Sequence, residues 1–231
     1  MRISGRQTLI FDADDTLWEN NILFERVIDD FTEWLAHPTL DPAQIRAIFD
    51  EIEAANTVTH GYGSTVFLGS LRDCFAHLNE RPVTDAERAE IEGLAAALVR
   101  GDVELIPAVA ETLDELGSRH DLLLMTKGVP AEQQRKLDVS GLGRHFAAIN
   151  IVPEKDVSAY RALIARHGLD PAESWMIGNS PKSDILPARA VGMRAVFIPN
   201  VNTWILEHAS LDEADRGVLT LDSFGELTTY F

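Results

Sequence analysis

The chain has 231 residues, of which 45% are hydrophobic and 25% charged, as in an ordinary globular protein with a buried core. Its 20 basic and 37 acidic residues give a net charge of −17, which disfavours binding to nucleic-acid backbones. No apolar run reaches the roughly 18–20 residues that span a bilayer. Cys74 is the single cysteine, so no internal disulfide is expected. We therefore expect a cytoplasmic protein without nucleic-acid or membrane partners.

The first part of the chain predicts one buried strand followed by a block of helices. Residues 8–11 (TLIF) are a short apolar run that ends at an aspartate-rich turn, which is typical of a buried strand with carboxylates at its C-terminal end. Apolar residues then recur at spacings of three and four, so residues 18–104 are expected to be helical and to contain no strand. The helices are expected over residues 24–35, from Asp41-Pro42 onward, over 66–78 and over 85–99.

From residue 105 onward, strand and helix patterns alternate. Because such alternation builds a parallel sheet with helices on both faces, we expect a doubly wound, mostly parallel, Rossmann-like α/β core that also takes in the first strand. The expected domains are this core, residues 1–17 with 105–231, and an inserted all-helical cap, residues 18–104. The strands are expected over residues 122–125, 147–152, 174–177 and 194–198, and the helices over 111–116, 131–137, 157–167 and 184–191.

Polar residues follow four of the predicted strands at the point where each strand ends. In a doubly wound sheet these ends meet in one crevice. Three carboxylates and an amide there form a site of hard oxygen ligands suited to Mg²⁺, and Mg²⁺ with a lysine neutralises a phosphate dianion. In chain order the residues are Asp12 and Asp14, then Thr126, Lys127 and Gly128, then Lys155, and finally Asn179 and Asp184.

The chemistry of such a crevice follows from the residue types. A carboxylate beside the cation can attack phosphorus and form an aspartyl-phosphate. A second carboxylate two residues later can protonate the leaving oxygen and then deprotonate water for the second step. The seven histidines include no pair at zinc-binding spacing, so a zinc site is not expected.

The motifs resemble those of one known family. Residues 11–17 (FDADDTL) resemble the first motif of the haloacid dehalogenase-like hydrolase superfamily. Thr126, Lys155 in VPEKD and residues 177–184 (IGNSPKSD) resemble the second, third and fourth motifs, in the family's order. The predicted helical block resembles the cap that some members insert between the first two motifs.

The resemblance implies a role for each matching residue. Asp12 would be the nucleophile and a Mg²⁺ ligand, and Asp14 the general acid and base, with its backbone carbonyl also bound to Mg²⁺. Thr126 and Lys155 would hold the phosphoryl oxygens, and Asp184 would be a further Mg²⁺ ligand. Because the family's carbon–halogen-cleaving members lack the second aspartate and work without metal, the presence of Asp14 favours phosphoryl transfer.

The sequence departs from the family pattern at three positions, of which Ala108, where glycine is common, is given no functional meaning. Asp15 stands where glycine is usual and adds negative charge near the site. Asn179 stands where the family has aspartate, and its amide oxygen would coordinate a cation with less charge. Simpler roles stay open: Asn179 as a turn residue, Asp184 as the N-cap of the following helix, and Lys127 as a rim charge.

Substrate-binding candidates lie beside the motifs and in the predicted cap. They are Thr126, Lys127 and Gly128 after the second strand, Asn20 after the first motif, and His60 and Tyr62 in a glycine-flanked loop that also fits an ordinary turn. The expected function is hydrolysis of a small phosphomonoester by a Mg²⁺-dependent phosphatase, as a monomer or homodimer. A sugar phosphomutase, a metal-independent 2-haloacid dehalogenase and a catalytically weakened binding or regulatory protein are the alternatives.

Overall fold

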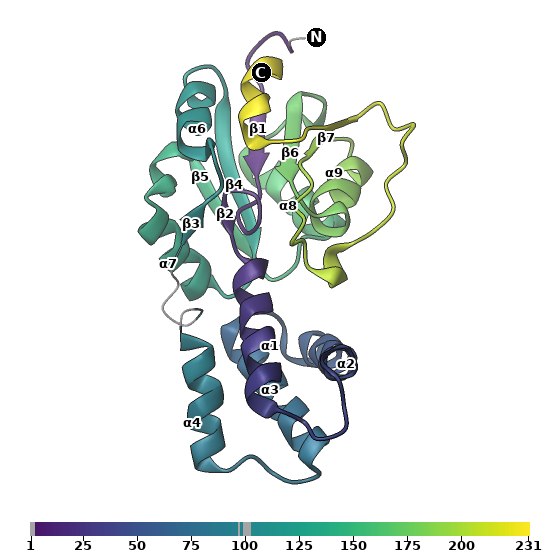
Figure 1. Cartoon of the computed structure of the whole chain (residues 1–231). Helices are drawn as coiled ribbons and strands as arrows, with labels where there is room; N and C mark the ends of the chain where they lie inside the picture. The colour runs from purple at the N-terminus through teal and green to yellow at the C-terminus, as the bar shows by residue number, and fades with distance from the viewer. Residues whose placement is uncertain (1–2, 97, 99–102) are drawn as a thin grey trace. The chain divides into compact units, whose positions relative to one another are not determined.

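The computed structural model describes residues 3–96, 98 and 103–231 (Figure 1). The chain divides into two compact units. One unit, here called the core unit, comprises Met1–Asn21 and Val103–Phe231, and the other, the helical unit, comprises Ile22–Asp102. Within the described residues, no helix is both long enough and apolar enough to cross a membrane.

A six-stranded parallel sheet forms the centre of the core unit, in the order β5-β4-β1-β6-β7-β8. β1 (Thr8–Phe11) lies between β4 and β6, where Phe11 is aligned with Leu124 and Ile177. The segments that follow these three strands therefore start from one edge of the sheet, and the predicted doubly wound core is confirmed. The other strands are β4 (Asp121–Lys127), β5 (Ala148–Val152), β6 (Ser174–Gly178), β7 (Arg194–Phe197) and β8 (Val218–Thr220), of which β8 was not predicted.

Side chains along β1 alternate between two apolar layers, as the period of a strand requires. Leu9 and Phe11 join a cluster that includes residues of α6 (Val109–Gly117), α7 (Pro130–Ser140) and α10 (Leu227–Tyr230). Ile10 belongs to the opposite cluster, with residues of α8 (Val157–His167) and α9 (Leu186–Ala190). Helices thus cover both faces of the sheet, as Figure 1 shows for α6 and α7 on one side and α8 and α9 on the other. Each fully buried apolar side chain contributes about 1.5–3 kcal/mol.

A short antiparallel ribbon corrects the prediction that residues 18–104 contain no strand. β2 (Trp18–Glu19) pairs with β3 (Glu104–Leu105), with Trp18 opposite Leu105. The ribbon lies where the chain leaves the core unit and where it returns. Two residues are too few to show a strand's alternation, so the sequence carried no signal for it.

The helical unit has its own apolar core. Phe49 and Phe67 pack edge to face in that core, with ring centroids 5.7 Å apart. Asp41 caps the second helix as predicted, because its side chain accepts from the backbone N–H of Gln44 and Pro42 occupies the first turn. The helices are α1 (Asn21–Leu35), α2 (Pro42–His60), α3 (Ser64–Asn79) and α4 (Asp85–Leu94); Val99, the predicted end of the last, lies outside the described residues.

Candidate active site

The turn after β1 places the first aspartate of the DADD segment at the edge of the sheet. The backbone N–H of Asp12 donates to the carbonyl of Ile177 at 2.9 Å, which extends the pairing of β1 with β6 by one residue. Asp15 adopts a left-handed conformation (φ 59°), and its Oδ1 accepts from the backbone N–H groups of Asn20 and Asn21, each at 2.9 Å. Despite these two donors, burial raises the pKa of Asp15 to about 7. The residue that replaces the family's glycine therefore closes the turn and caps the start of α1.

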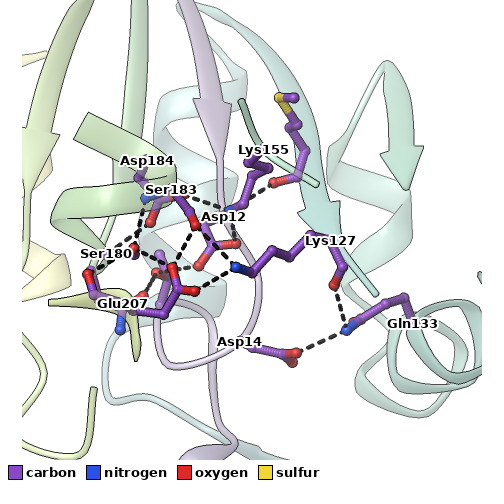
Figure 2. Close-up of polar contacts among 12 residues, drawn as sticks. Asp12, Asp14, Lys127, Gln133, Lys155, Ser180, Ser183, Asp184 and Glu207 are labelled. Carbon is purple, nitrogen blue, oxygen red and sulfur yellow. Dashed lines mark hydrogen bonds and ion pairs between the residues drawn. The ribbon is translucent and has the colours of Figure 1, made fainter. Parts of the chain in front are cut away.

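Lys155 joins two carboxylates that come from distant parts of the chain. Its Nζ donates to Asp12 Oδ1 and, at 2.5 Å, to Asp184 Oδ1 (Figure 2). The relative exposures are 6% for Asp12, 3% for Lys155 and 0% for Asp184. Burial and the neighbouring Asp12 carboxylate raise the pKa of Asp184 to about 7. Although burial opposes it, the charge of the two carboxylates raises the pKa of Lys155. Three predicted site residues are thus brought together.

A short helical turn after β6 holds Asp184 in place. Ser180 caps η3 (Pro181–Ile185), a π-helical turn, and its Oγ accepts from the N–H of Ser183 at 2.9 Å. The backbone N–H of Ser180 donates to Asp184 Oδ2 at 2.9 Å. A Cβ at Gly178 would lie 2.2 Å from that same oxygen, so only glycine fits there. The alternative role of Asp184 as a helix N-cap is wrong, because Ser180 is the cap.

Asn179 faces the aspartate turn, and the orientation of its amide decides whether the site can hold a cation. As placed, its Nδ2 donates to Thr203 Oγ1 at 2.8 Å, and that hydroxyl donates to the Asn200 carbonyl at 2.8 Å. The Asn179 oxygen then accepts from the Thr16 hydroxyl at 3.2 Å and otherwise faces two acceptors, Asp12 Oδ2 and the Asp14 carbonyl. Turning the amide over would direct its nitrogen at the Asp14 carbonyl and at Asp12 Oδ2, each at 3.3 Å. The Thr203 hydroxyl already donates its proton to Asn200 and cannot also donate to a turned amide, so the first orientation is favoured. The oxygens of Asn179, of Asp12 and of the Asp14 backbone then converge, and such a donor set fits Mg²⁺.

The side chain of Asp14 takes a different direction from that of Asp12. Its Oδ1 accepts from Trp18 Nε1 and from Lys136 Nζ, each at 2.7 Å, and its Oδ2 accepts from Gln133 Nε2 at 2.8 Å. Figure 2 shows the carboxylate pointing toward Gln133 on α7. Against the effect of burial, these contacts, with Lys136 the largest, lower the pKa of Asp14.

The three predicted carboxylate side chains are not grouped around one point within the described residues, and their binding of a cation stays a prediction. Within residues 3–96, 98 and 103–231, no group of three His, Cys, Asp or Glu side chains is arranged to hold a metal. The Asp14 side chain is engaged elsewhere, and both oxygens of Asp184 already accept hydrogen bonds. Among the predicted ligands, the converging oxygens are those of Asp12, the Asp14 backbone carbonyl and Asn179.

A second ion pair, which is partly buried, lies beside the first. Lys127 Nζ donates to Glu207 Oε1 at 2.5 Å and to Ser183 Oγ at 3.0 Å. Glu207, which is 7% exposed, also accepts from the hydroxyls of Ser180 and Ser183, at 2.6 and 2.5 Å. Against the effect of burial, Lys127 and the two hydroxyls lower the pKa of Glu207 to about 2. Lys127 is therefore not an isolated rim charge but part of a partly buried network of ion pairs and hydrogen bonds.

Glu207→Gln is expected to lower the free energy of unfolding at pH 7 by about 2–3 kcal/mol, because it leaves Lys127 with only the more distant and more exposed Glu154 as a counter-ion. Since folding lowers the pKa of Glu207, its contribution is complete above pH 4.5 and declines as the pH falls toward 2. Urea denaturation should show the loss shrinking by about 1 kcal/mol between pH 7 and pH 3.5. Glu213→Gln, at an exposed position, is the control. A loss independent of pH would contradict the ion-pair argument.

The remaining predicted residues fall into two groups. Thr126 is buried near the end of β4, and Gly128, with a φ of +132°, directly follows that strand. Asn20 Oδ1 accepts from Lys136 Nζ at 2.7 Å, which places Asn20 beside the Asp14 contacts. His60 and Tyr62 lie in the helical unit, at the end of α2 and in the loop that follows, so their contact with substrate stays a prediction.

Three residues around the site were missed by the sequence analysis. Gln133 and Lys136 are three positions apart on α7, the helix directly after the second motif. This spacing puts them on one face of the helix, which is a signal that could have been used. Glu207 lies in η4 (Ile205–Glu207), a short 3₁₀ turn after β7, and no sequence pattern distinguishes it from the chain's other glutamates.

The fold and the site are those of a hydrolase family with an aspartate at the end of its first strand. Residues 7–192 match the family model of haloacid dehalogenase-like hydrolases, and the chain belongs to this family. It is 26% identical over 229 residues to Protein CbbY of Cereibacter sphaeroides, covering 96% of this chain and 94% of that protein. It is 35% identical over 82 residues to a phosphoserine phosphatase of Thermus thermophilus, but this match spans only 33% of either chain.

Solved structures share the fold. A haloacid dehalogenase-like family hydrolase from Xanthomonas campestris superposes with a TM-score of 0.82 at 24% identity, covering 97% of this chain and 94% of that one. The L-2-haloacid dehalogenase of Xanthobacter autotrophicus superposes with a TM-score of 0.61 at 17% identity, covering 97% of both chains. At these identities the likeness concerns the fold alone.

Proposed function

We propose that the protein is a Mg²⁺-dependent phosphatase that hydrolyses a small phosphomonoester through an aspartyl-phosphate on Asp12. The observation that carries the proposal is the joining of Asp12 and Asp184 by Lys155 at the strand ends. A second carboxylate, Asp14, follows two residues after Asp12. The partial likeness to a phosphoserine phosphatase supports the same class of substrate.

The residues of the site account for both halves of the reaction. In the first, an Asp12 oxygen attacks phosphorus while the bond from phosphorus to the leaving oxygen breaks. Asp14, which must enter this step protonated although its contacts lower its pKa, gives its proton to that oxygen. In the second, Asp14 takes a proton from water, the water oxygen bonds to phosphorus, and the Asp12 carboxylate leaves. Lys155, with Thr126, would hold the phosphoryl oxygens and offset their charge.

A cation is needed because the site is rich in carboxylates and the substrate is an anion. The oxygens of Asp12, of the Asp14 backbone and of Asn179 would hold Mg²⁺. Bound there, the ion supplies positive charge that offsets the phosphoryl oxygens. Asn179 brings no charge of its own, so the protein would bind the cation more weakly than a site with aspartate at this position.

Assays should show phosphate release from members of a panel of metabolite monophosphates in the presence of Mg²⁺. EDTA should reduce the rate by about 10²-fold or more, and added Mg²⁺ should restore it, because the carboxylates alone repel the substrate. An equal rate in EDTA would overturn the metal assignment, and a panel without any phosphate release would overturn the phosphatase proposal.

Two further readouts separate the alternatives. Formation of an isomeric sugar phosphate instead of free phosphate would identify a phosphomutase. Release of halide from 2-haloacids in EDTA would identify a dehalogenase. Asp14 argues against the latter, because displacement of halide needs no proton on the leaving group.

A further inference from the structure

The contacts of Asp14 go beyond what its proposed role explains. The proton-transfer role proposed for Asp14 does not by itself say what holds its side chain, and both Asp14 oxygens accept from donors in two parts of the core unit. Trp18 belongs to β2, directly after the aspartate turn. Gln133 and Lys136 belong to α7, more than a hundred residues further along the chain.

The Gln133 amide has a defined orientation. Its Nε2 donates to Asp14 Oδ2 at 2.8 Å and to the Lys127 carbonyl at 3.2 Å. Turning the amide over would place Oε1 against both of these acceptors. Oε1 itself is buried without a hydrogen-bond partner within the described residues, although an unsatisfied buried oxygen costs about 1–3 kcal/mol. Gln133, which is 5% exposed, is thus placed to serve Asp14 rather than to satisfy its own polar atoms.

The Gln133 amide occupies space that is free because residue 128 is a glycine and has no side chain. A Cβ at residue 128 would lie 3.1 Å from Gln133 Nε2, and the φ of +132° at this position disfavours any other residue. The turn after β4 therefore contributes to the site through Gly128. It provides the room in which the Gln133 side chain reaches Asp14.

Lys136 is fixed from two sides. Its Nζ donates to Asp14 Oδ1 and to Asn20 Oδ1, each at 2.7 Å. The side chains of Lys136 and Asp14 are 18% and 24% exposed to solvent. Because solvent screens the charges, this ion pair adds little to the free energy of unfolding. What it does provide is a fixed direction for one carboxylate oxygen, at the same atom to which Trp18 Nε1 donates.

We propose that Gln133 and Lys136, with Trp18, are positioning residues that hold the Asp14 carboxylate in place for proton transfer to the leaving oxygen. The inference rests on the proposed phosphatase function. A proton donor must lie within hydrogen-bond reach of the leaving oxygen, and an error of 1 Å in its place can cost about 10²-fold in rate. Three donors at fixed positions restrict rotation of the Asp14 side chain, so its carboxyl oxygens keep a defined position.

The leaving group gives a readout that a merely structural role would not affect. An alkyl phosphate needs its leaving oxygen protonated, whereas p-nitrophenolate leaves without a proton. For Gln133→Leu and Lys136→Met, we expect kcat/KM to fall about tenfold or more with an alkyl phosphate and less than about threefold with p-nitrophenyl phosphate. The parameter kcat/KM is used because it covers the steps through phosphoryl transfer to Asp12.

The variants have matched controls. Gln134→Leu changes the neighbouring glutamine on α7, which is exposed and donates to Asp138, and should leave both substrates unaffected. Lys136→Arg keeps a charged donor and should recover part of the alkyl phosphate activity lost in Lys136→Met. Thermal unfolding of each variant checks that it is folded. If the variant at residue 133 or at residue 136 does not fold, the variant at the other position still tests the inference.

Each outcome decides the inference. A larger loss with the alkyl phosphate supports it. Equal losses with the two substrates, or no loss with either, overturn it while leaving the phosphatase proposal intact. A wild-type protein that hydrolyses neither substrate overturns both the phosphatase proposal and this inference.

Discussion

Asp12→Asn is expected to abolish phosphate release, with a loss of about 10³-fold or more, while the protein stays folded. An amide has almost the same shape as the carboxylate but cannot form the acyl-phosphate. Lys155 would keep its ion pair with Asp184 and a hydrogen-bond acceptor at residue 12, so the free energy of unfolding should change by no more than about 1–2 kcal/mol.

The covalent intermediate provides the direct measurement. Wild-type protein quenched during turnover should carry a phosphoryl group on the peptide that contains Asp12, and Asp12→Asn should carry none. Asp222→Asn, at an exposed position after β8, an edge strand of the sheet, is the matched control and should retain both activity and labelling. Full activity of Asp12→Asn on a substrate of the wild-type protein would remove Asp12 from the role of nucleophile.

Lys155→Met should be the most destabilising of the substitutions proposed here. It leaves the Asp12 and Asp184 carboxylates buried without the cation that both contact. Removing one partner from a buried ion pair costs about 3–5 kcal/mol, because the remaining charge keeps its desolvation penalty. Phosphate release should be lost as well, since no other cation within the described residues contacts both carboxylates.

A double variant tests the cause of this loss. Asp184→Asn removes one of the two carboxylates with almost no change of shape, so it should recover part of the stability that Lys155→Met loses. Urea denaturation of the wild type, both single variants and the double variant gives the coupling energy. Additive losses would show that Lys155 acts through packing of its side chain and not through its charge.

The order of the motifs and the edge of the sheet at which they meet follow from local sequence patterns. Short apolar runs ending at Asp12, Thr126 and Asn179 predicted buried strands, and their alternation with helices predicted a parallel sheet. All three strands are in the structure and are neighbours in the sheet. Lys155 follows a fourth strand in the same way, and its meeting with Asp12 and Asp184 is a consequence of that topology.

Sequence patterns did not predict three short strands of the structure. β2 and β3 have two residues each and β8 has three, so none of them reaches the roughly four residues over which alternation identifies a strand. Their pairing depends on partners far along the chain. Trp18, for example, pairs with Leu105, after the whole helical unit has intervened.

The sequence by itself determined the class of fold, the order of the motifs and the positions of Asp12, Lys155 and Asp184, because strand and helix periods and the rule for parallel sheets depend on neighbouring residues. Only the tertiary structure decided the partners of the other side chains. It directs the Asp14 carboxylate to Gln133, 119 residues away, and pairs Lys127 with Glu207, 80 residues away. Such contacts form between side chains from separate elements, and the polar residues that make them resemble any other surface residue until the sheet and helices have packed.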